Sequence, residues 1–472
     1  MANKNKIAGD AGENILLMTD SYKFTHWKQY PPGIQAVFSY FESRGGMFPE
    51  TVFFGLQYII KRYMEGSVVT KEKIEEAEEI VALHLGDKKL FNRDGWEHIL
   101  KEHDGKLPLS IKAVPEGSVV RTHNALITVE NTCEKCYWLT NYMETMLVQT
   151  WYPTTVATLS FNMKKLILKY LEETGTPELA DFKLHDFGYR GVSSIESAGI
   201  GGAAHLVNFK GTDTVASLQV LKKYYNAPMA GFSIPAAEHS TITSWGRENE
   251  PKAMDNMLVQ YPVGTVAVVS DSYNIYEASS KIWGEMLRDK VLKRDGTVVI
   301  RPDSGNPPEV VLKVISILGE KFGYTINAKN YKVLNEHIRI IQGDGIDFSM
   351  TNDILETLKN NGWSADNIAF GMGGALLQKL HRDTQKCAFK CSSVTVNNEE
   401  RDVYKEPITD KGKNSKAGRL KLVIRNGEYE TVTEKEPGKN ELVEIFRNGR
   451  AIREYSLEQV RERAKLGLAN AR

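Results

Sequence analysis

The stretch 183–191, Lys-Leu-His-Asp-Phe-Gly-Tyr-Arg-Gly, combines a carboxylate, an imidazole, aromatic rings and a guanidinium. Charged and polar side chains are rarely found together in a buried strand, whereas they are common at the rim of a binding site. A short apolar run followed by polar or glycine residues recurs along the chain. The further apolar runs are residues 206–209, 231–234, 266–269, 298–300, 338–341 and 368–370. The pattern predicts strands that each deliver polar side chains at their carboxyl ends.

The spacing of these runs indicates the fold. The gaps between them are roughly 20–40 residues, enough for one crossover helix each. Parallel strands buried on both faces are continuously apolar, and sites in closed α/β sheets form at the carboxyl ends of the strands. Residues 181–390 are therefore predicted to form a β/α barrel, irregular or incomplete. An open doubly wound sheet is the alternative, although no Gly-x-Gly-x-x-Gly fingerprint follows an early strand.

Composition narrows the class of protein. A length of 472 residues predicts two or three domains, and 41% hydrophobic with 25% charged residues is ordinary for a globular chain. Lys plus Arg and Asp plus Glu each number 60, so the zero net charge argues against nucleic acid or an acidic membrane as the main partner. Residues 1–20 lack a secretory apolar core and no membrane-length apolar run is present, so we expect a cytoplasmic protein.

The four cysteines are too few for a disulfide framework, which fits a reducing compartment. Cys133-x2-Cys136 and Cys387-x3-Cys391 could in principle form a four-thiolate zinc site. No histidine or further cysteine supports that site, and Cys391 falls in a strand-like run. The sequence therefore leaves the metal ligands of this protein unknown.

Residues 1–180 and 391–472 lack the barrel pattern, and we expect them to combine in one sandwich-like α+β domain. Residues 70–85 have the cap and apolar face of a helix, and residues 137–152 are apolar enough for a buried one. Asn426-Gly427 and Asn448-Gly449 each separate two strand-like runs, a strong hairpin signal. Ser456-x-x-Gln459 is a capping box that opens a terminal helix. The Lys-, Gly- and Asp-rich residues 405–419 are typical of a solvated loop.

The predicted barrel mouth collects carboxylates, two arginines and a histidine. Such a set suits a polyanion held with a hard cation, and Mg²⁺ prefers a few carboxylates plus phosphate oxygens. Residues 371–374, Gly-Met-Gly-Gly, offer backbone N–H groups as a phosphate seat. Each single Asp could instead cap the helix that follows it. The set comprises Asp186, Arg190, Asp213, Glu238, His239, Asp271, Arg301, Asp303, Asp344 and Asp347.

Longer strings carry a resemblance to a known family. They lie in order over nearly the whole chain and are unlike generic phosphate loops. The strings are residues 19–23, 137–141, 185–194, 208–214, 235–241, 270–273, 301–307, 342–345 and 376–380. On them the chain resembles the nicotinamide phosphoribosyltransferases, a branch of the type II phosphoribosyltransferase family, in a bacterial or phage form. The resemblance implies a cytoplasmic homodimer with active sites shared between subunits. It also implies that nicotinamide and phosphoribosyl pyrophosphate give nicotinamide mononucleotide in NAD salvage, with Mg²⁺ and with ATP as co-substrate.

The resemblance also implies roles for single residues. Phe187 would stack on one face of the nicotinamide ring and Tyr22 of the other subunit on the opposite face. Asp213 would accept from the carboxamide, and Arg301 would contact the amide side of the ring and the phosphate. The ribose would be held by Asp303, Gly343 and Asp344. The 5′-phosphate would be held by Gly373 and Gly374, with Arg382 and Lys390 of the other subunit. Pyrophosphate would be held by Arg190, with Arg44, Lys405 and Lys413 of the other subunit.

By the same resemblance, His239 would be the histidine that ATP phosphorylates, flanked by Glu238 and Asp271. The chain departs from the family at Met372, where serine is more frequent, and has Ala267 and Ala388 where serine can occur. Two alternatives stay open. Nicotinate phosphoribosyltransferase shares the architecture, and a non-catalytic binding or signalling protein could keep the fold.

Overall fold

The computed structural model describes residues 13–409 and 414–470. The chain forms two compact units. Unit 1 contains the residues up to Thr158, Lys223–Ala227 and the residues from His381 onward, and unit 2 contains Leu159–Lys222 and Pro228–Leu380. Within the described residues, every helix is too short or too polar to cross a membrane.

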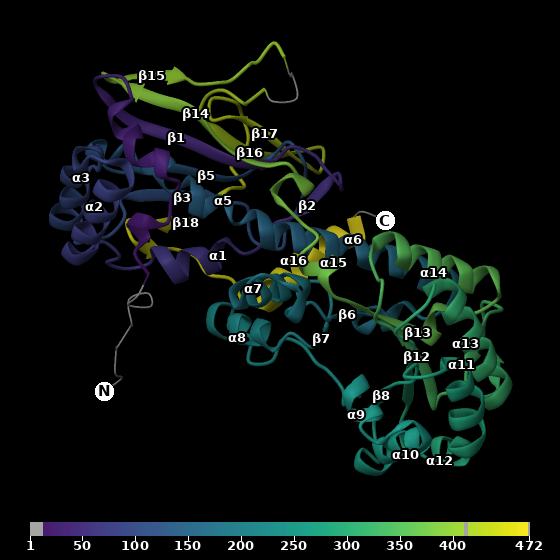
Figure 1. Cartoon of the computed structure of the whole chain (residues 1–472). Helices are drawn as coiled ribbons and strands as arrows, with labels where there is room; N and C mark the ends of the chain where they lie inside the picture. The colour runs from purple at the N-terminus through teal and green to yellow at the C-terminus, as the bar shows by residue number, and fades with distance from the viewer. Residues whose placement is uncertain (1–12, 410–413, 471–472) are drawn as a thin grey trace, which may run out of the picture. The chain divides into compact units, whose positions relative to one another are not determined.

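Unit 1 is built on an antiparallel sheet of seven strands, in the order β15-β14-β1-β5-β3-β18-β19. The N-terminal strands β1, β5 and β3 form the centre of this sheet, and C-terminal strands flank them on both sides, as Figure 1 shows for β14 beside β1. The expected union of the two ends of the chain in one α+β domain is therefore confirmed. The strands of unit 1 are β1 (Ile34–Ser43), β2 (Glu50–Val52), β3 (Leu109–Ala113), β4 (Val119–Arg121), β5 (Ala125–Asn131), β14 (Cys387–Val396), β15 (Glu399–Asp402), β16 (Leu420–Arg425), β17 (Glu428–Thr433), β18 (Val443–Arg447) and β19 (Arg450–Ala451).

Local signals in unit 1 acted as expected. Thr70 caps the helix that follows it by accepting from Lys73 N. The Asn426-Gly427 turn has positive φ at both residues, 52° and 81°, and joins β16 to β17. The helices and turns here are η1 (Ile15–Leu17), η2 (Ser21–Lys28), α1 (Leu56–Ile59), η3 (Ile60–Met64), α2 (Lys71–Leu85), η4 (Lys88–Leu90), α3 (Arg93–Glu102), η5 (Glu134–Cys136), α4 (Leu139–Tyr142), α5 (Glu144–Val148), η11 (Arg382–Thr384) and α16 (Leu457–Asn470).

Unit 2 is built on a parallel sheet in the order β7-β6-β13-β12-β9-β8. Residues 232–237 bridge both edge strands, because Phe232 pairs with Gly211 of β7 and Ala236 pairs with Ala267 of β8. This segment curls the sheet into the predicted irregular barrel. The strands are β6 (Leu184–Asp186), β7 (Gly211–Thr212), β8 (Val266–Val269), β9 (Val298–Arg301), β12 (Ile338–Gln342) and β13 (Ile368–Met372), with a separate hairpin of β10 (Tyr324–Ile326) and β11 (Lys332–Leu334).

Helices surround the parallel strands, as Figure 1 shows for α10 to α14 around β8, β12 and β13. The helix α6 (Trp151–Thr174) begins in unit 1 and ends in unit 2. The helices and turns of unit 2 are η6 (Pro177–Phe182), η7 (Tyr189–Gly191), α7 (Ile195–His205), α8 (Val215–Tyr224), α9 (His239–Thr243), η8 (Arg247–Asn249), α10 (Glu250–Gln260), α11 (Ile275–Glu277), η9 (Ala278–Met286), α12 (Arg288–Leu292), α13 (Pro307–Phe322), α14 (Phe348–Asn360), η10 (Ala365–Asn367) and α15 (Gly374–Leu377).

Three expected elements differ in the structure. Residues 231–234 form none of the named strands and contribute only the isolated bridge between Phe232 and Gly211. Residues 206–209 follow the end of α7, and the strand is β7, which begins at Gly211. Residues 137–152 form short helices with a break at Met143. An apolar run indicates that a segment is buried, and burial alone does not distinguish a strand from a helix end. The boundaries expected at 181 and 390 fall inside η6 and β14, whereas the two compact units divide at Thr158/Leu159 and Leu380/His381.

Candidate functional site

Phe187 lies at the carboxyl end of β6, in the barrel mouth. Its N–H donates to Met372 O at 3.0 Å, and its ring packs against the apolar cluster of Ala267, Val299 and Ile341. A Cβ on Gly371 would lie 2.0 Å from Phe187 Cε2, so only glycine leaves room for the ring there. A flat aromatic ring supported from below is a platform for a planar ligand.

Asp186 and Asp213 end the two neighbouring strands β6 and β7. The Asp186 carboxylate is buried and accepts from Gly188 N at 2.7 Å, while its Oδ2 has no protein partner. Asp213 is exposed and accepts a hydrogen bond from Ser233 Oγ, which comes from the bridging segment 232–237. Sequence reasoning gave no role to Ser233, because its neighbour in space is twenty residues away along the chain.

Asp186→Asn should make stability less dependent on pH. Burial raises the pKa of Asp186 to about 6, from an ordinary 3.8. The protonated carboxyl therefore favours folding, and that contribution is lost as the pH rises through about 6. Between about pH 4 and pH 7, the wild type should lose about 2–3 kcal/mol of unfolding free energy relative to the variant. Urea midpoints measured across this range check it, and parallel curves for the two proteins would contradict the shift.

His239 begins α9 and sits in a carboxylate network. Its Nε2 lies 2.9 Å from Asp271 Oδ1, and its Nδ1 lies 4.0 Å from Asp303 Oδ2. The other oxygen of Asp271 accepts from Ser304 Oγ at 2.6 Å and from Asp303 N at 3.2 Å. Asp271 is nearly buried, at 5% side-chain exposure, whereas His239 is 46% exposed. The network thus holds one imidazole nitrogen and leaves the more distant Nδ1 accessible.

Of the two carboxylates predicted beside His239, only Asp271 forms a hydrogen bond with the imidazole. Asp271 orients the imidazole as expected. Glu238 is instead the residue directly before α9; its N–H donates to Thr241 Oγ1 at 3.3 Å and its carboxylate accepts from Ser240 Oγ. Ser304, to which sequence reasoning gave no role, completes the network because it follows Asp303 directly.

Arg301 ends β9 with its guanidinium half enclosed. It donates to Ala237 O and to Asp303 Oδ2, each at 3.4 Å, and its Nε is buried without a protein partner. These bonds are long, so the guanidinium retains capacity for an anionic or carbonyl ligand.

The Gly-rich turn follows β13. Gly373 directly precedes α15, and a Cβ on Gly374 would meet no atom within 4 Å, so the space beside Gly374 is open. The helix has only four residues, so its dipole is small and a phosphate would depend on individual N–H groups. Asp347 has a structural role, because it caps α14 by accepting from Met350 N at 2.9 Å. Asp344 and Arg190 are exposed near the ends of β12 and β6.

The implied partner-subunit residues gather in unit 1. Tyr40 of β1 pairs with Lys390 of β14, and Arg44 follows β1. Burial lowers the pKa of Lys390, Glu144 opposes this, and Arg44, Arg382 and Lys405 lower the pKa further. Arg44 Nε and Nη1 are buried without partners. Four cations thus share one region with the single carboxylate of Glu144, a charge balance that suits an anionic ligand. Lys413 lies outside the described residues.

Tyr22 lies in η2, and its side chain is 58% exposed. The next residue, Lys23, is buried and pairs with Glu144 at 2.7 Å, which anchors η2 to α5. Glu144 also acts on Lys390, so Tyr22 and the cations belong to one neighbourhood of unit 1. The residues assigned to the other subunit are thus all in unit 1, and the remaining site residues are all in unit 2.

Comparison with known proteins agrees with this architecture. Residues 182–450 match the nicotinate phosphoribosyltransferase (NAPRTase) family, and residues 14–111 match the nicotinamide phosphoribosyltransferase N-terminal domain. The fold resembles that of nicotinate-nucleotide pyrophosphorylase from Pyrococcus furiosus, with a TM-score of 0.62 and 16% identity over 99% of this chain and 98% of that one. It also resembles human nicotinic acid phosphoribosyltransferase, with a TM-score of 0.55 and 15% identity over 96% and 94% of the two chains.

Relatives with higher sequence identity bear a more specific name. Nicotinamide phosphoribosyltransferase from Xanthomonas campestris is 52% identical over 96% of this chain and 98% of the relative. Nicotinamide phosphoribosyltransferase from Acinetobacter baylyi is 33% identical over 95% and 97%. The length and identity of these matches show that the chain belongs to the nicotinamide phosphoribosyltransferase family of enzymes.

Proposed function

We propose that this chain transfers the phosphoribosyl group of phosphoribosyl pyrophosphate to nicotinamide, giving nicotinamide mononucleotide and pyrophosphate in NAD salvage. The observation that carries the proposal is the ring of Phe187 in the barrel mouth, beside Gly343 and Asp303. Production of nicotinamide mononucleotide by the purified protein tests it, and a protein that binds both substrates without forming product would overturn it.

Each group of site residues is proposed to bind one part of the substrates. Phe187 supports the pyridine ring, Asp213 accepts from the carboxamide N–H, and the unpartnered Arg301 Nε faces an acceptor on the substrate. Asp303 and Asp344, with Gly343, hold the ribose hydroxyls. The open turn at Gly373 and Gly374 holds the 5′-phosphate, and Arg190 meets the pyrophosphate.

The site is completed by a second copy of the chain. Tyr22 covers the other face of the pyridine ring, and the cation group of unit 1 meets the phosphates. In this group, Arg382 and Lys390 bind the 5′-phosphate, while Arg44, Lys405 and Lys413 bind pyrophosphate. The buried, unpartnered nitrogens of Arg44 support this role, since such donors are costly without an anion.

The chemistry needs no nucleophile from the protein. The anomeric carbon becomes oxocarbenium-like as pyrophosphate leaves, and the arginine and lysine side chains stabilise the growing negative charge. The two aromatic rings hold the pyridine nitrogen in line with that carbon. Mg²⁺ bound with the substrate supplies further charge neutralisation. Asp303 and Asp344 could each give it one oxygen, which fits an ion held mostly by phosphates and water.

ATP is proposed to act through His239. Asp271 fixes Nε2, so Nδ1 is the nitrogen that would receive the phosphoryl group. The phosphoryl–oxygen bond of ATP breaks as the nitrogen–phosphorus bond forms, and ADP leaves. The added charge lies beside Asp303 and would tighten metal-bound phosphoribosyl pyrophosphate. The enzyme is placed in the cytoplasm, where its four free cysteines stay reduced.

A nicotinate substrate is the second candidate, because the family matched by residues 182–450 is named for it. The position of Asp213 argues for nicotinamide, since two facing carboxylates repel each other. Asp213→Asn should lower the preference for nicotinamide over nicotinate by roughly 10–150-fold, the value of one charge-assisted hydrogen bond of about 1.5–3 kcal/mol. The ratio of kcat/KM for the two substrates measures it. Asp289→Asn, on the exposed face of α12, is the matched control. An unchanged ratio in Asp213→Asn would remove Asp213 from substrate recognition.

A further inference from the structure

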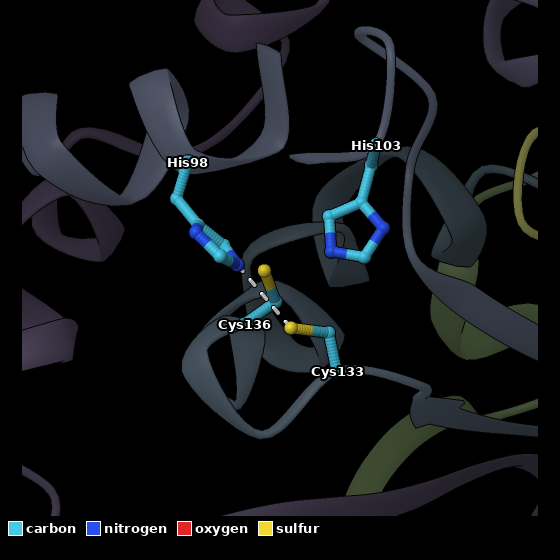
Figure 2. A group of neighbouring side chains, drawn as sticks. All are labelled: His98, His103, Cys133 and Cys136. Atoms are coloured by element: carbon cyan, nitrogen blue, oxygen red, sulfur yellow. Dashed lines mark hydrogen bonds between the residues drawn. The ribbon is translucent and has the colours of Figure 1, made fainter. Parts of the chain in front are cut away.

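Two histidines and two cysteines meet in unit 1, among elements that carry none of the barrel residues. His98 and His103 come from the end of α3, and Cys133 and Cys136 come from the turn η5 after β5. One ligand atom from each side chain can be chosen so that all four lie within 4.8 Å of one another. Figure 2 shows the imidazole of His103 directed toward the two sulfurs. The carboxylates and phosphate-binding groups of the proposed transfer site are absent from this cluster.

Local structure holds the four side chains in place. The N–H of His103 donates to Ile99 O at 3.1 Å, so the backbone of His103 continues the last turn of α3. Cys136 N donates to Cys133 O at 2.9 Å, which closes a tight turn with both thiols on one side. Asn131 Nδ2 also donates to Cys133 O at 2.9 Å and ties this turn to the end of β5. The cluster is therefore a product of ordered backbone and not of long, flexible side chains.

One polar atom of the cluster lacks a hydrogen-bond partner in the protein. His103 Nε2 is buried and has no hydrogen-bond partner. His98 Nε2 lies 3.4 Å from Cys133 Sγ, and the two imidazole rings are 5.5 Å apart at 77°. Buried imidazole nitrogens are normally satisfied, so an orphaned nitrogen beside two thiols indicates a missing ligand.

We propose that His98, His103, Cys133 and Cys136 bind one structural Zn²⁺ ion. Two thiolates and two neutral imidazoles form a tetrahedral set for zinc, and the spacings Cys-x2-Cys and His-x4-His are those of zinc sites. Binding breaks two S–H bonds, releases both protons to solvent and forms two zinc–sulfur and two zinc–nitrogen bonds. The centre is then neutral, so it can be partly buried without a further counter-charge. Four protein ligands leave no open position, so the ion is structural and not catalytic.

The bound ion would join α3 to the segment that follows η5. That segment continues into α4 and α5, which carries Glu144, the partner of Lys23 in η2. The ion would therefore stabilise the part of unit 1 that presents Tyr22. The ion would take no part in the transfer chemistry itself, so metal content tests the zinc proposal separately from synthesis of nicotinamide mononucleotide.

The test is the metal content of the full-length protein, expressed with added zinc, purified without chelators and measured by plasma mass spectrometry. We expect about one zinc per chain, and a cobalt-substituted protein should show the visible bands of tetrahedral thiolate coordination. Cys133→Ser and Cys136→Ser should weaken zinc binding by more than about 100-fold. Cys391→Ser, which changes a half-buried cysteine of β14 outside the cluster, should retain full zinc.

A second measurement on the wild type covers the case in which the cysteine variants fail to fold. Removing the metal with a strong chelator should lower Tm by at least about 5 °C, and added zinc, but not Mg²⁺, should restore it. Protein that contains no zinc and gives no thiolate band with cobalt would overturn the proposal. A disulfide between Cys133 and Cys136 in freshly purified, unoxidised protein would overturn it equally, since both thiols would be consumed.

Discussion

Mixing impaired Tyr22→Ala chains with impaired Phe187→Ala chains is expected to raise synthesis of nicotinamide mononucleotide above that of either variant alone. The proposed site combines Phe187 of one subunit with Tyr22 of the other, so a heterodimer has one fully wild-type site and one doubly altered site. Random exchange makes half of the dimers heterodimers, so activity should reach about a quarter of the wild-type level. Each variant alone loses one stacking face, worth about 1–3 kcal/mol or roughly 5–150-fold.

The matched control pairs two variants of unit 2. Phe187→Ala mixed with Arg301→Ala should not recover, because each site of that heterodimer then carries one of the two changes. Subunit exchange is verified with differently tagged chains before activity is measured. If the first pair fails to recover despite proven exchange, or if the control pair recovers equally well, the shared-site arrangement is wrong.

His239→Ala is expected to abolish phosphoryl labelling from γ-labelled ATP, together with ATP hydrolysis during turnover. Wild-type protein should carry an acid-labile, base-stable label, because phosphohistidine has those properties. ATP should lower the KM for nicotinamide in the wild type and not in the variant, while ATP-independent synthesis remains. Asp271→Asn should reduce the labelling rate by roughly 10–150-fold, since it loses the charge-assisted hydrogen bond to Nε2.

His84→Ala is the control for this experiment, because His84 is an exposed histidine in the last turn of α2. It should label and turn over like the wild type. Equal labelling of His239→Ala and wild type would identify another acceptor. Loss of labelling in His84→Ala would point to a general effect of histidine removal on the fold.

Sequence alone was sufficient for elements that depend on neighbours along the chain. Residues 266–269, 298–300, 338–341 and 368–370 all became barrel strands, because a continuous apolar run is what a parallel strand buried on both faces requires. The Asn426-Gly427 hairpin and the Ser456–Gln459 capping box formed because their signals act within a few residues. The polar residues at the strand ends followed from the same pattern.

Tertiary structure decided what depends on contacts between distant segments. The closure of the barrel rests on residues 232–237, whose bridges to β7 and β8 are isolated and leave no periodic signal. The binding of Asp271 to both His239 and Ser304 required β8, β9 and α9 to converge. The sequence offered Cys387 and Cys391 as the only further thiols for a site with Cys133 and Cys136, and gave no support for that grouping. The neighbours of Cys133 and Cys136 are His98 and His103, because the packing of α3 against η5 is set by the folded core and not by spacing along the chain.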